Sequence, residues 1–203
     1  MTAEIGVGRI LRHALVAAGA LLVAAGSGTP PARAQLGSKI AGVQLEDSAG
    51  VAHTLDEYAG KIVVLAFWSF KCPVALGHAP HIGALVEKYG KRGIVVLGIN
   101  SNTNESALEI KRNAANLNLP FPVFQDRDGV LADKVGATHA PSVFILDRSG
   151  VLRYRGALDN NKRPGESGRT AFAEEAVEAL LEGRAPAVAE SKEVGCTLKR
   201  RPF

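Results

Sequence analysis

Long apolar runs alternate with amphipathic segments along most of the chain, and this alternation predicts an α/β domain. A strand that is covered on both faces reads as a nearly continuous apolar run. Such runs predict buried strands at 62–68, 94–99, 121–124 and 143–146. Apolar residues at the 3.6-residue period predict helices at 72–89, from 104 or 105 to 117, at 130–135 and at 170–181. Strands that alternate with helices in this way favour a central mixed sheet flanked by helices.

Shorter signals complete the predicted order of elements. Residues 40–45 and 51–54 flank the turn 47–50 and predict an N-terminal β-hairpin, followed by one helical turn at 55–58. The 143–146 strand and the segment from Val151 predict a second hairpin across Ser149-Gly150. The expected core faces of the first two helices are Ile82, Leu85, Val86 and Tyr89, and then Ala107, Ile110, Ala114 and Leu117.

The N-terminus has the pattern of a secretory leader. Arg9, Arg12 and His13 precede an apolar run at 14–25, and Ala32-Arg33-Ala34 matches a cleavage site. A membrane-spanning helix is the alternative, but it needs about 20 apolar residues, and this run is interrupted at 26–28. We therefore expect a signal peptide at 1–34, one domain at 35–184 and a C-terminal tail at 185–203. The expected location is periplasmic or secreted, with no membrane anchor after cleavage.

Charge and cysteine content restrict the function classes. The formal net charge is +4, and removal of the basic leader lowers it further, so the balance is too mild to indicate nucleic-acid binding. After the leader the chain has two cysteines, Cys72 and Cys196, and an exported protein meets an oxidising compartment. Redox chemistry at these two sulfurs is therefore the first candidate.

Cys72 lies where an apolar strand ends and a helix begins. Pro73 follows it and is favoured in the first helical turn. A thiol there meets free backbone N–H groups and the positive end of the helix dipole, which favour the thiolate. Lys71 would act in the same direction if its ammonium lies near the sulfur. The alternative is that Cys72 is only a small buried hydrophobic residue.

Two prolines extend the pattern. Pro80 stands eight residues after Cys72, inside the predicted helix, and Pro141 opens the apolar 143–146 strand, a position where proline is often cis. With the sequence Phe-Trp-x-x-x-Cys-Pro at 67–73, these features resemble the thioredoxin-like superfamily over roughly residues 37–183. The 152–156 segment, followed by Asp159, is similar to secreted redoxins related to the AhpC/TSA group. The resemblance implies a thioredoxin-like fold, with Cys72 as the nucleophile and Pro141 beside it.

The chain departs from both branches of that superfamily. Ala75 stands where a C-x-x-C oxidoreductase has its second cysteine, and Ala66 stands where the usual buried acid would be. A peroxiredoxin motif would need proline at Leu65 and threonine at Ser69, where only the serine hydroxyl is a substitute. The arginine that peroxiredoxins hold beside the thiolate maps onto Pro141. Thiol–disulfide exchange is therefore favoured over peroxide reduction, which stays open.

Cys196 is the candidate resolving cysteine. From Gly183 its tail can span about 40 Å when extended, which is comparable with the size of the domain. The favoured hypothesis is that Cys72 attacks a disulfide-bearing protein or a peroxide, Cys196 closes an internal disulfide, and an external thiol reductant reopens it. The alternative is a non-catalytic binding or structural module in which the disulfide only anchors the tail.

A metal site is the third interpretation. His78, His81 and His139 could join Cys72 around copper or zinc, as in thioredoxin-fold copper carriers, but those use paired cysteines that this chain lacks. His78 is predicted to be a hydrogen-bonded core residue and His81 to point elsewhere. His139 could tune the charge of the Cys72 sulfur or only cap a loop. No metal and no cofactor are therefore expected.

Overall fold

The central sheet has seven strands, in the order β2-β1-β5-β4-β3-β7-β8. The computed structural model describes residues 1–2, 33–161 and 169–200, so the expected signal peptide lies almost entirely outside the described residues. Strands β3 (Ile62–Phe67), β4 (Ile94–Asn100) and β5 (Val123–Gln125) are parallel, and β7 (Ser142–Leu146) is antiparallel to β3. The expected mixed sheet of a thioredoxin-like fold is therefore confirmed.

Both predicted hairpins are present. Strand β1 (Gln44–Glu46) pairs antiparallel with β2 (Ala52–Thr54), and a 3₁₀ turn at Leu55–Tyr58 follows. Strand β8 (Leu152–Gly156) pairs antiparallel with β7 at one edge of the sheet. A separate two-stranded sheet is formed by β6 (His139–Ala140) and β9 (Cys196–Thr197). The sequence pattern indicated neither of these two short strands, because two residues are too few to show a period.

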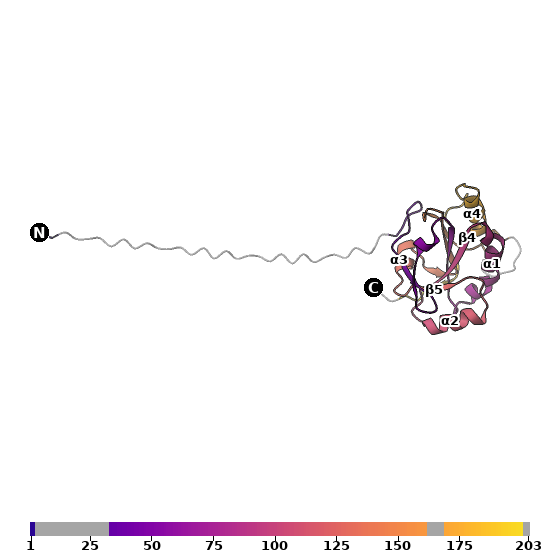
Figure 1. Ribbon diagram of the computed structural model, residues 1–203, viewed down its shortest axis with the longest axis horizontal. Helices are drawn as coiled ribbons and strands as arrows, with labels where there is room; N and C mark the ends of the chain where they lie inside the picture. The colour runs from indigo at the N-terminus through magenta and orange to yellow at the C-terminus, as the bar shows by residue number, and fades with distance from the viewer. Residues whose placement is uncertain (3–32, 162–168, 201–203) are drawn as a thin grey trace. The chain divides into compact units, whose positions relative to one another are not determined.

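The side chains of β3 alternate between two apolar cores, one on each face of the sheet. Ile62, Val64 and Ala66 belong to a core that includes residues of α1 (Pro73–Tyr89), α2 (Ala107–Asn116) and α4 (Phe172–Leu181). Val63 and Leu65 belong to the other, with α3 (Val130–Val135) and the N-terminal segment. Figure 1 shows α1 and α3 on opposite sides of strands β4 and β5. All six β3 residues are buried, which explains why their sequence lacks alternation.

The helices end close to the expected positions, with two errors in the predicted core. Ser106 and Glu109 form a capping box at the start of α2. Ile110 is buried, but Leu117 is 47% exposed because the helix ends at Asn116, before the apolar period brings this residue to the core. Ala107, the first residue of α2, is exposed too. The predictions that Ala107 and Leu117 are core residues were therefore wrong. None of the helices within the described ranges combines the length and the apolar character that crossing a bilayer requires.

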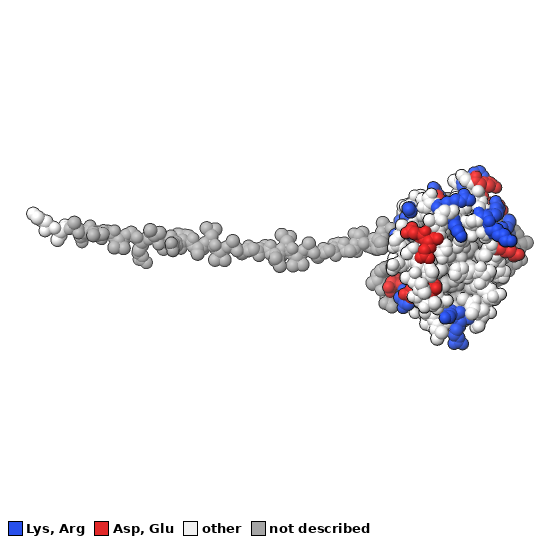
Figure 2. Space-filling view, in the orientation of Figure 1, with Lys and Arg blue, Asp and Glu red and all other residues white. Residues whose placement is uncertain are grey.

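Charged side chains are mixed in sign on the face drawn in Figure 2. Lys and Arg lie in small groups there, and groups of Asp and Glu and uncharged surface lie between them. This face carries no continuous basic surface of the kind that follows a nucleic-acid backbone.

Candidate redox site at the start of helix α1

Cys72 is the N-cap residue of α1. Its backbone is extended, with φ −105° and ψ 111°, and Pro73 occupies the first helical position. The Cys72 carbonyl accepts the Leu76 amide at 3.0 Å, which is the first bond of the helix. The sulfur therefore lies at the positive end of a 17-residue helix, as the sequence predicted.

Cys72 forms a disulfide with Cys196. The two Cα atoms are 5.9 Å apart, within the usual range for a disulfide, across a sequence separation of 124 residues. Cys72 is only 1% exposed, whereas Cys196 is partly buried at the edge of the same core. Cys196 is therefore the more accessible of the two sulfurs.

The bond between Ala140 and Pro141 is cis, and it lies beside the disulfide. The Ala140 carbonyl oxygen is 3.1 Å from Cys72 Sγ. In the antiparallel pair formed by β6 and β9, Ala140 lies opposite Cys196 and His139 lies opposite Thr197. The structure therefore brings together Cys72, Cys196 and the residue before Pro141, three parts of the chain that are far apart in sequence.

Two glycines allow the tail to approach this closely. Gly195 has φ +157°, and a Cβ there would lie 2.2 Å from the Ala140 oxygen. Gly156 has φ +138°, and a Cβ there would lie 2.3 Å from the Ser191 oxygen. Any side chain at either position would displace the tail, so Gly195 is part of the site. Its position directly before Cys196 was the only signal in the sequence.

The tail also has anchors other than the disulfide. The Tyr154 hydroxyl donates to the Ala157 carbonyl at 2.6 Å and contacts Ser191 Oγ at 2.7 Å, and burial raises the pKa of Tyr154 to about 12. The Leu198 amide donates to the Thr138 carbonyl at 2.9 Å. These contacts bind the tail to the domain on both sides of Cys196.

A buried carboxylate shapes the loop before Cys72, and the sequence analysis missed it. Glu105 is 2% exposed; it accepts the Ser69 hydroxyl at 2.5 Å and the Phe70 amide at 2.8 Å. It belongs to the polar loop after β4, whose end lies beside the end of β3. That location, where ligands of α/β sheets often bind, was the available signal.

Three other candidate residues have their polar partners away from the sulfur. The Lys71 ammonium contacts the Asn104 carbonyl and lies 3.3 Å from the Glu109 carboxylate. The Ser69 hydroxyl is bonded to Glu105, as described. His139 Nδ1 lies 2.8 Å from Thr138 Oγ1 and 3.3 Å from the Glu193 carboxylate of the tail. Lys71, Ser69 and His139 therefore shape the loop and hold the tail; the structure records no contact between them and Cys72 Sγ.

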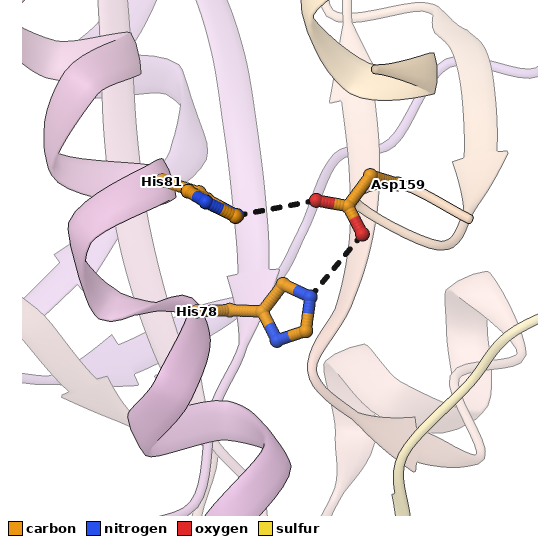
Figure 3. A group of neighbouring side chains, drawn as sticks. All are labelled: His78, His81 and Asp159. Carbon is orange, nitrogen blue, oxygen red and sulfur yellow. Dashed lines mark hydrogen bonds and ion pairs between the residues drawn. The ribbon is translucent and has the colours of Figure 1, made fainter. Parts of the chain in front are cut away.

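A second polar cluster lies on the same helix. His78 and His81 both point toward Asp159, which follows β8, so the prediction that His81 points elsewhere was wrong (Figure 3). Residues three apart on a helix are neighbours, which is the physical reason for the error. His78 is buried and hydrogen-bonded, as predicted. The structure does not group these histidines with His139 and Cys72.

The protonation of this cluster follows from its charges. Burial alone would lower the pKa of His78, but the Asp159 carboxylate and the Val74 carbonyl outweigh it and raise that pKa. Burial and the Arg169 guanidinium lower the pKa of His81. Burial opposes ionisation of Asp159, yet His78 and Arg169 hold the pKa of its carboxyl far below the usual value. Asp159 is therefore an anion at all physiological pH values.

Comparison with known proteins identifies relatives of this chain. Residues 36–155 match the model of the AhpC/TSA family. The thiol-disulfide oxidoreductase ResA of Geobacillus thermodenitrificans is 30% identical over 118 residues, which cover 58% of this chain and 67% of the relative. The thiol:disulfide interchange protein DsbE of Yersinia pestis is 30% identical over 133 residues, which cover 64% and 68%.

Solved structures agree on the fold. A hypothetical protein of Sinorhizobium meliloti superposes with a TM-score of 0.74 and 26% identity, covering 85% of this chain and 98% of the other. The thioredoxin domain of a thiol-disulfide oxidoreductase of Bacteroides vulgatus superposes with a TM-score of 0.53 and 17% identity, covering 60% and 88%. The second likeness concerns the fold alone.

Proposed function

Because this chain belongs to the AhpC/TSA family, we propose that it is an exported thiol–disulfide oxidoreductase. In this proposal Cys72 is the nucleophile and Cys196 is the resolving cysteine. The observation that carries it is the Cys72–Cys196 disulfide, which joins a helix N-cap to a tail strand beside cis-Pro141. The names of the ResA and DsbE relatives support the same class of reaction.

The reaction balances with the two cysteines alone. In the reduced protein, the Cys72 thiolate attacks one sulfur of a substrate disulfide and forms a mixed disulfide, while the other substrate sulfur leaves as a thiolate and takes a proton. The Cys196 thiolate then attacks the Cys72 sulfur. The second substrate sulfur leaves, and the Cys72–Cys196 disulfide remains. The substrate gains two electrons and two protons, and the protein loses them.

The exposure of the two sulfurs suggests how the disulfide is reopened. A thiolate of an external dithiol reductant attacks the more accessible Cys196, and Cys72 leaves as a thiolate. The leaving thiolate lies at the N-terminus of α1, where the helix dipole and free N–H groups stabilise negative charge. The second thiol of the reductant then releases Cys196. A disulfide with this environment is an unsuitable permanent anchor, because a stabilised leaving group makes it easier to reduce.

Peroxide is the second candidate substrate, since the site retains a serine three residues before Cys72. The serine expected to assist a peroxide and the lysine expected to favour the thiolate both have other partners. The Ser69 hydroxyl donates to Glu105, and the Lys71 ammonium pairs with Glu109. Thiol–disulfide exchange does not need the serine hydroxyl, so we favour it.

The test compares wild type, Cys72→Ser and Cys196→Ser in the reduction of a protein disulfide by a dithiol, and in the consumption of hydrogen peroxide. We expect wild type to accelerate disulfide reduction, Cys72→Ser to abolish the acceleration, and Cys196→Ser to accumulate a mixed disulfide on Cys72. Peroxide consumption that depends on Cys72, without disulfide reduction, would assign a peroxidase instead. A wild-type disulfide that resists mild dithiol, with neither activity present, would favour a structural module.

We also propose that residues 1–34 are a removed signal peptide, that 35–184 form the redox domain, and that 185–203 are the tail carrying Cys196. The basic, apolar and small-residue order of the leader supports export, and so does the disulfide, which persists in oxidising compartments. Mass analysis of the protein recovered from the periplasmic or secreted fraction tests this. A mature chain that begins at Gln35 is expected, and an intact leader on a cytosolic protein would refute it.

A further inference from the structure

Three electron-pair donors converge between α1 and the segment after β8. His78 Nε2 is 3.2 Å from one carboxylate oxygen of Asp159, and His81 Nδ1 is 3.2 Å from the other. One ligand atom from each residue lies within 4.8 Å of the other two. Figure 3 shows both imidazoles turned toward the carboxylate from successive turns of the helix. Side chains from two elements that are distant in sequence thus meet at one point.

Hydrogen bonding accounts for only part of this arrangement, because His78 bonds to both Val74 and Asp159 whereas His81 Nδ1 has no hydrogen bond. His78 Nδ1 lies 2.7 Å from the Val74 carbonyl and must donate to it, so Nε2 is the nitrogen that faces Asp159. His81 Nδ1 is buried and makes no hydrogen bond, although a carboxylate oxygen is 3.2 Å away, because its geometry is unsuitable. An orphaned buried ring nitrogen that lies beside a carboxylate of zero exposure is costly unless a further group binds it.

The surroundings hold these donors in place. The Asp159 carboxylate accepts the Asn161 amide at 2.9 Å and Arg169 Nε at 2.8 Å. Metal-ligating imidazoles usually donate their second N–H to a carbonyl or carboxylate, and ligating carboxylates are themselves hydrogen-bonded. His78, through the Val74 carbonyl, and Asp159 both follow this rule. Arg169 is a competing cation, but it also lies 3.9 Å from Glu174 and so has a second carboxylate.

We propose that His78, His81 and Asp159 form a binding site for one divalent transition-metal ion of the zinc type. Two imidazole nitrogens and one carboxylate oxygen suit zinc, and in a tetrahedral site with bonds of about 2.0–2.1 Å neighbouring ligand atoms are roughly 3.3 Å apart. Each nitrogen lies at this spacing from a different oxygen of the Asp159 carboxylate, 3.2 Å in both cases. One donor atom from each residue lies within 4.8 Å of the others, so small side-chain rotations bring two nitrogens and one oxygen onto a single ion. A cavity lined by His81, Arg169 and Glu174 adjoins the cluster on the His81 side and lets water or an exogenous ligand approach it.

Such an ion would join α1 to the chain after β8 at a point other than the disulfide. His78 is six residues after Cys72, about 9 Å along the helix axis. Neither cysteine is among the ligands, so the site is independent of the redox function proposed above. Its effect would be to brace the helix that carries Cys72.

The experiment is calorimetric titration of chelator-treated full-length protein with Zn²⁺ alone. The variants are His81→Ala, whose side chain is partly exposed and therefore tolerates truncation, Arg169→Gln, and the control His53→Ala. His53 also lies between two carboxylates, those of Asp47 and Glu57, so it controls for surface binding. Each variant is first checked for a native circular dichroism spectrum.

Wild type and His53→Ala are expected to bind one Zn²⁺ per chain with equal affinity. His81→Ala should bind at least about 10–100-fold more weakly, the range that even partners of ligands produce. Arg169→Gln keeps a donor for Asp159 but removes the competing charge, so it should bind several-fold more tightly. X-ray absorption of the wild-type complex should show nitrogen and oxygen ligands at about 2.0–2.1 Å.

The proposal is overturned if wild type shows no binding at Zn²⁺ concentrations up to about 1 mM. The Kd would then exceed about 1 mM, which is too weak for a built site. It is also overturned if His81→Ala retains wild-type affinity, or if His53→Ala loses it to the same extent. Sulfur ligands in the absorption spectrum would assign the ion to the cysteines and would refute this site as well.

Discussion

Replacement of Gly195 by alanine isolates the close approach of the tail to the cis-proline loop. A Cβ at this position would lie 2.2 Å from the Ala140 oxygen and 2.6 Å from the Ala140 carbonyl carbon. Carbon atoms normally stay about 3.3 Å or more from a carbonyl oxygen, so the tail must retreat by roughly 1 Å. The neighbouring β6–β9 pair, Ala140 and Cys196, would then separate. This separation would disturb the geometry that places Cys196 beside Cys72.

The magnitude follows from the contacts that this retreat weakens. Each backbone hydrogen bond lost from the β6–β9 pair costs about 0.5–1.5 kcal/mol. The loss of one or two such bonds, together with the strain of the new side chain, costs about 1–3 kcal/mol in total. Since about 1.4 kcal/mol corresponds to 30 mV for a two-electron couple, the reduction potential of the disulfide should rise by about 20–65 mV. The disulfide of Gly195→Ala should therefore be the more easily reduced.

The assay is equilibration with dithiothreitol buffers of graded ratio, followed by alkylation and mass measurement of the oxidised fraction. Gly183→Ala is the matched control, because Gly183 also has a positive φ of +74° but a Cβ there meets nothing within 4 Å. A potential of Gly195→Ala that stays within the shift seen for Gly183→Ala would refute the reasoning. It would mean that the contact with Ala140 does not set the position of Cys196.

Three further predictions concern stability. Cys196→Ser should lower the free energy of unfolding in urea by about 5 kcal/mol, from closure of a loop of 124 residues; equal stability of the variant and the oxidised wild type would contradict this. Glu105→Gln places an amide donor against the Ser69 hydroxyl or the Phe70 amide, both of which donate to Glu105. The free energy of unfolding in the same assay should therefore fall by about 1–3 kcal/mol. An unchanged urea midpoint would be the contrary result. Burial raises the pKa of Tyr154 to about 12, so the unfolded chain loses this proton near pH 10 while the folded chain keeps it. The contribution of Tyr154 to stability should therefore be complete below pH 10 and fall by up to about 2.7 kcal/mol toward pH 12. In urea titrations at these pH values, Tyr154→Phe should show a correspondingly smaller fall. Equal falls in both proteins would count against the burial of the phenol.

The tail contacts have a consequence for the proposed redox cycle. Ser191, Glu193 and Leu198 hold the tail through contacts that do not involve sulfur. After reduction, Cys196 should thus stay near Cys72, and the internal disulfide can re-form quickly because the two sulfurs keep a high effective concentration. The same contacts limit access to Cys72, which is 1% exposed, so a protein substrate must displace part of the tail.

The sequence by itself determined the elements whose signals are local. The apolar run at 62–67, the Cys72-Pro73 helix start and the Pro141 strand opening each depend on neighbouring residues, and each is present where the pattern predicted it. Burial on both faces removes alternation, and a proline beside a helix start restricts the backbone, whatever the rest of the chain does.

Only the tertiary structure decided which distant residues meet. The sequence allowed Cys196 to reach Cys72 but did not require it, because an extended tail of that length can end in many places. The meeting of His81 with Asp159, and of Ser69 with Glu105, depends on how strands and helices cross in space. Such contacts leave no period in the sequence. They follow from packing two apolar cores against one sheet, which places the ends of separate elements side by side.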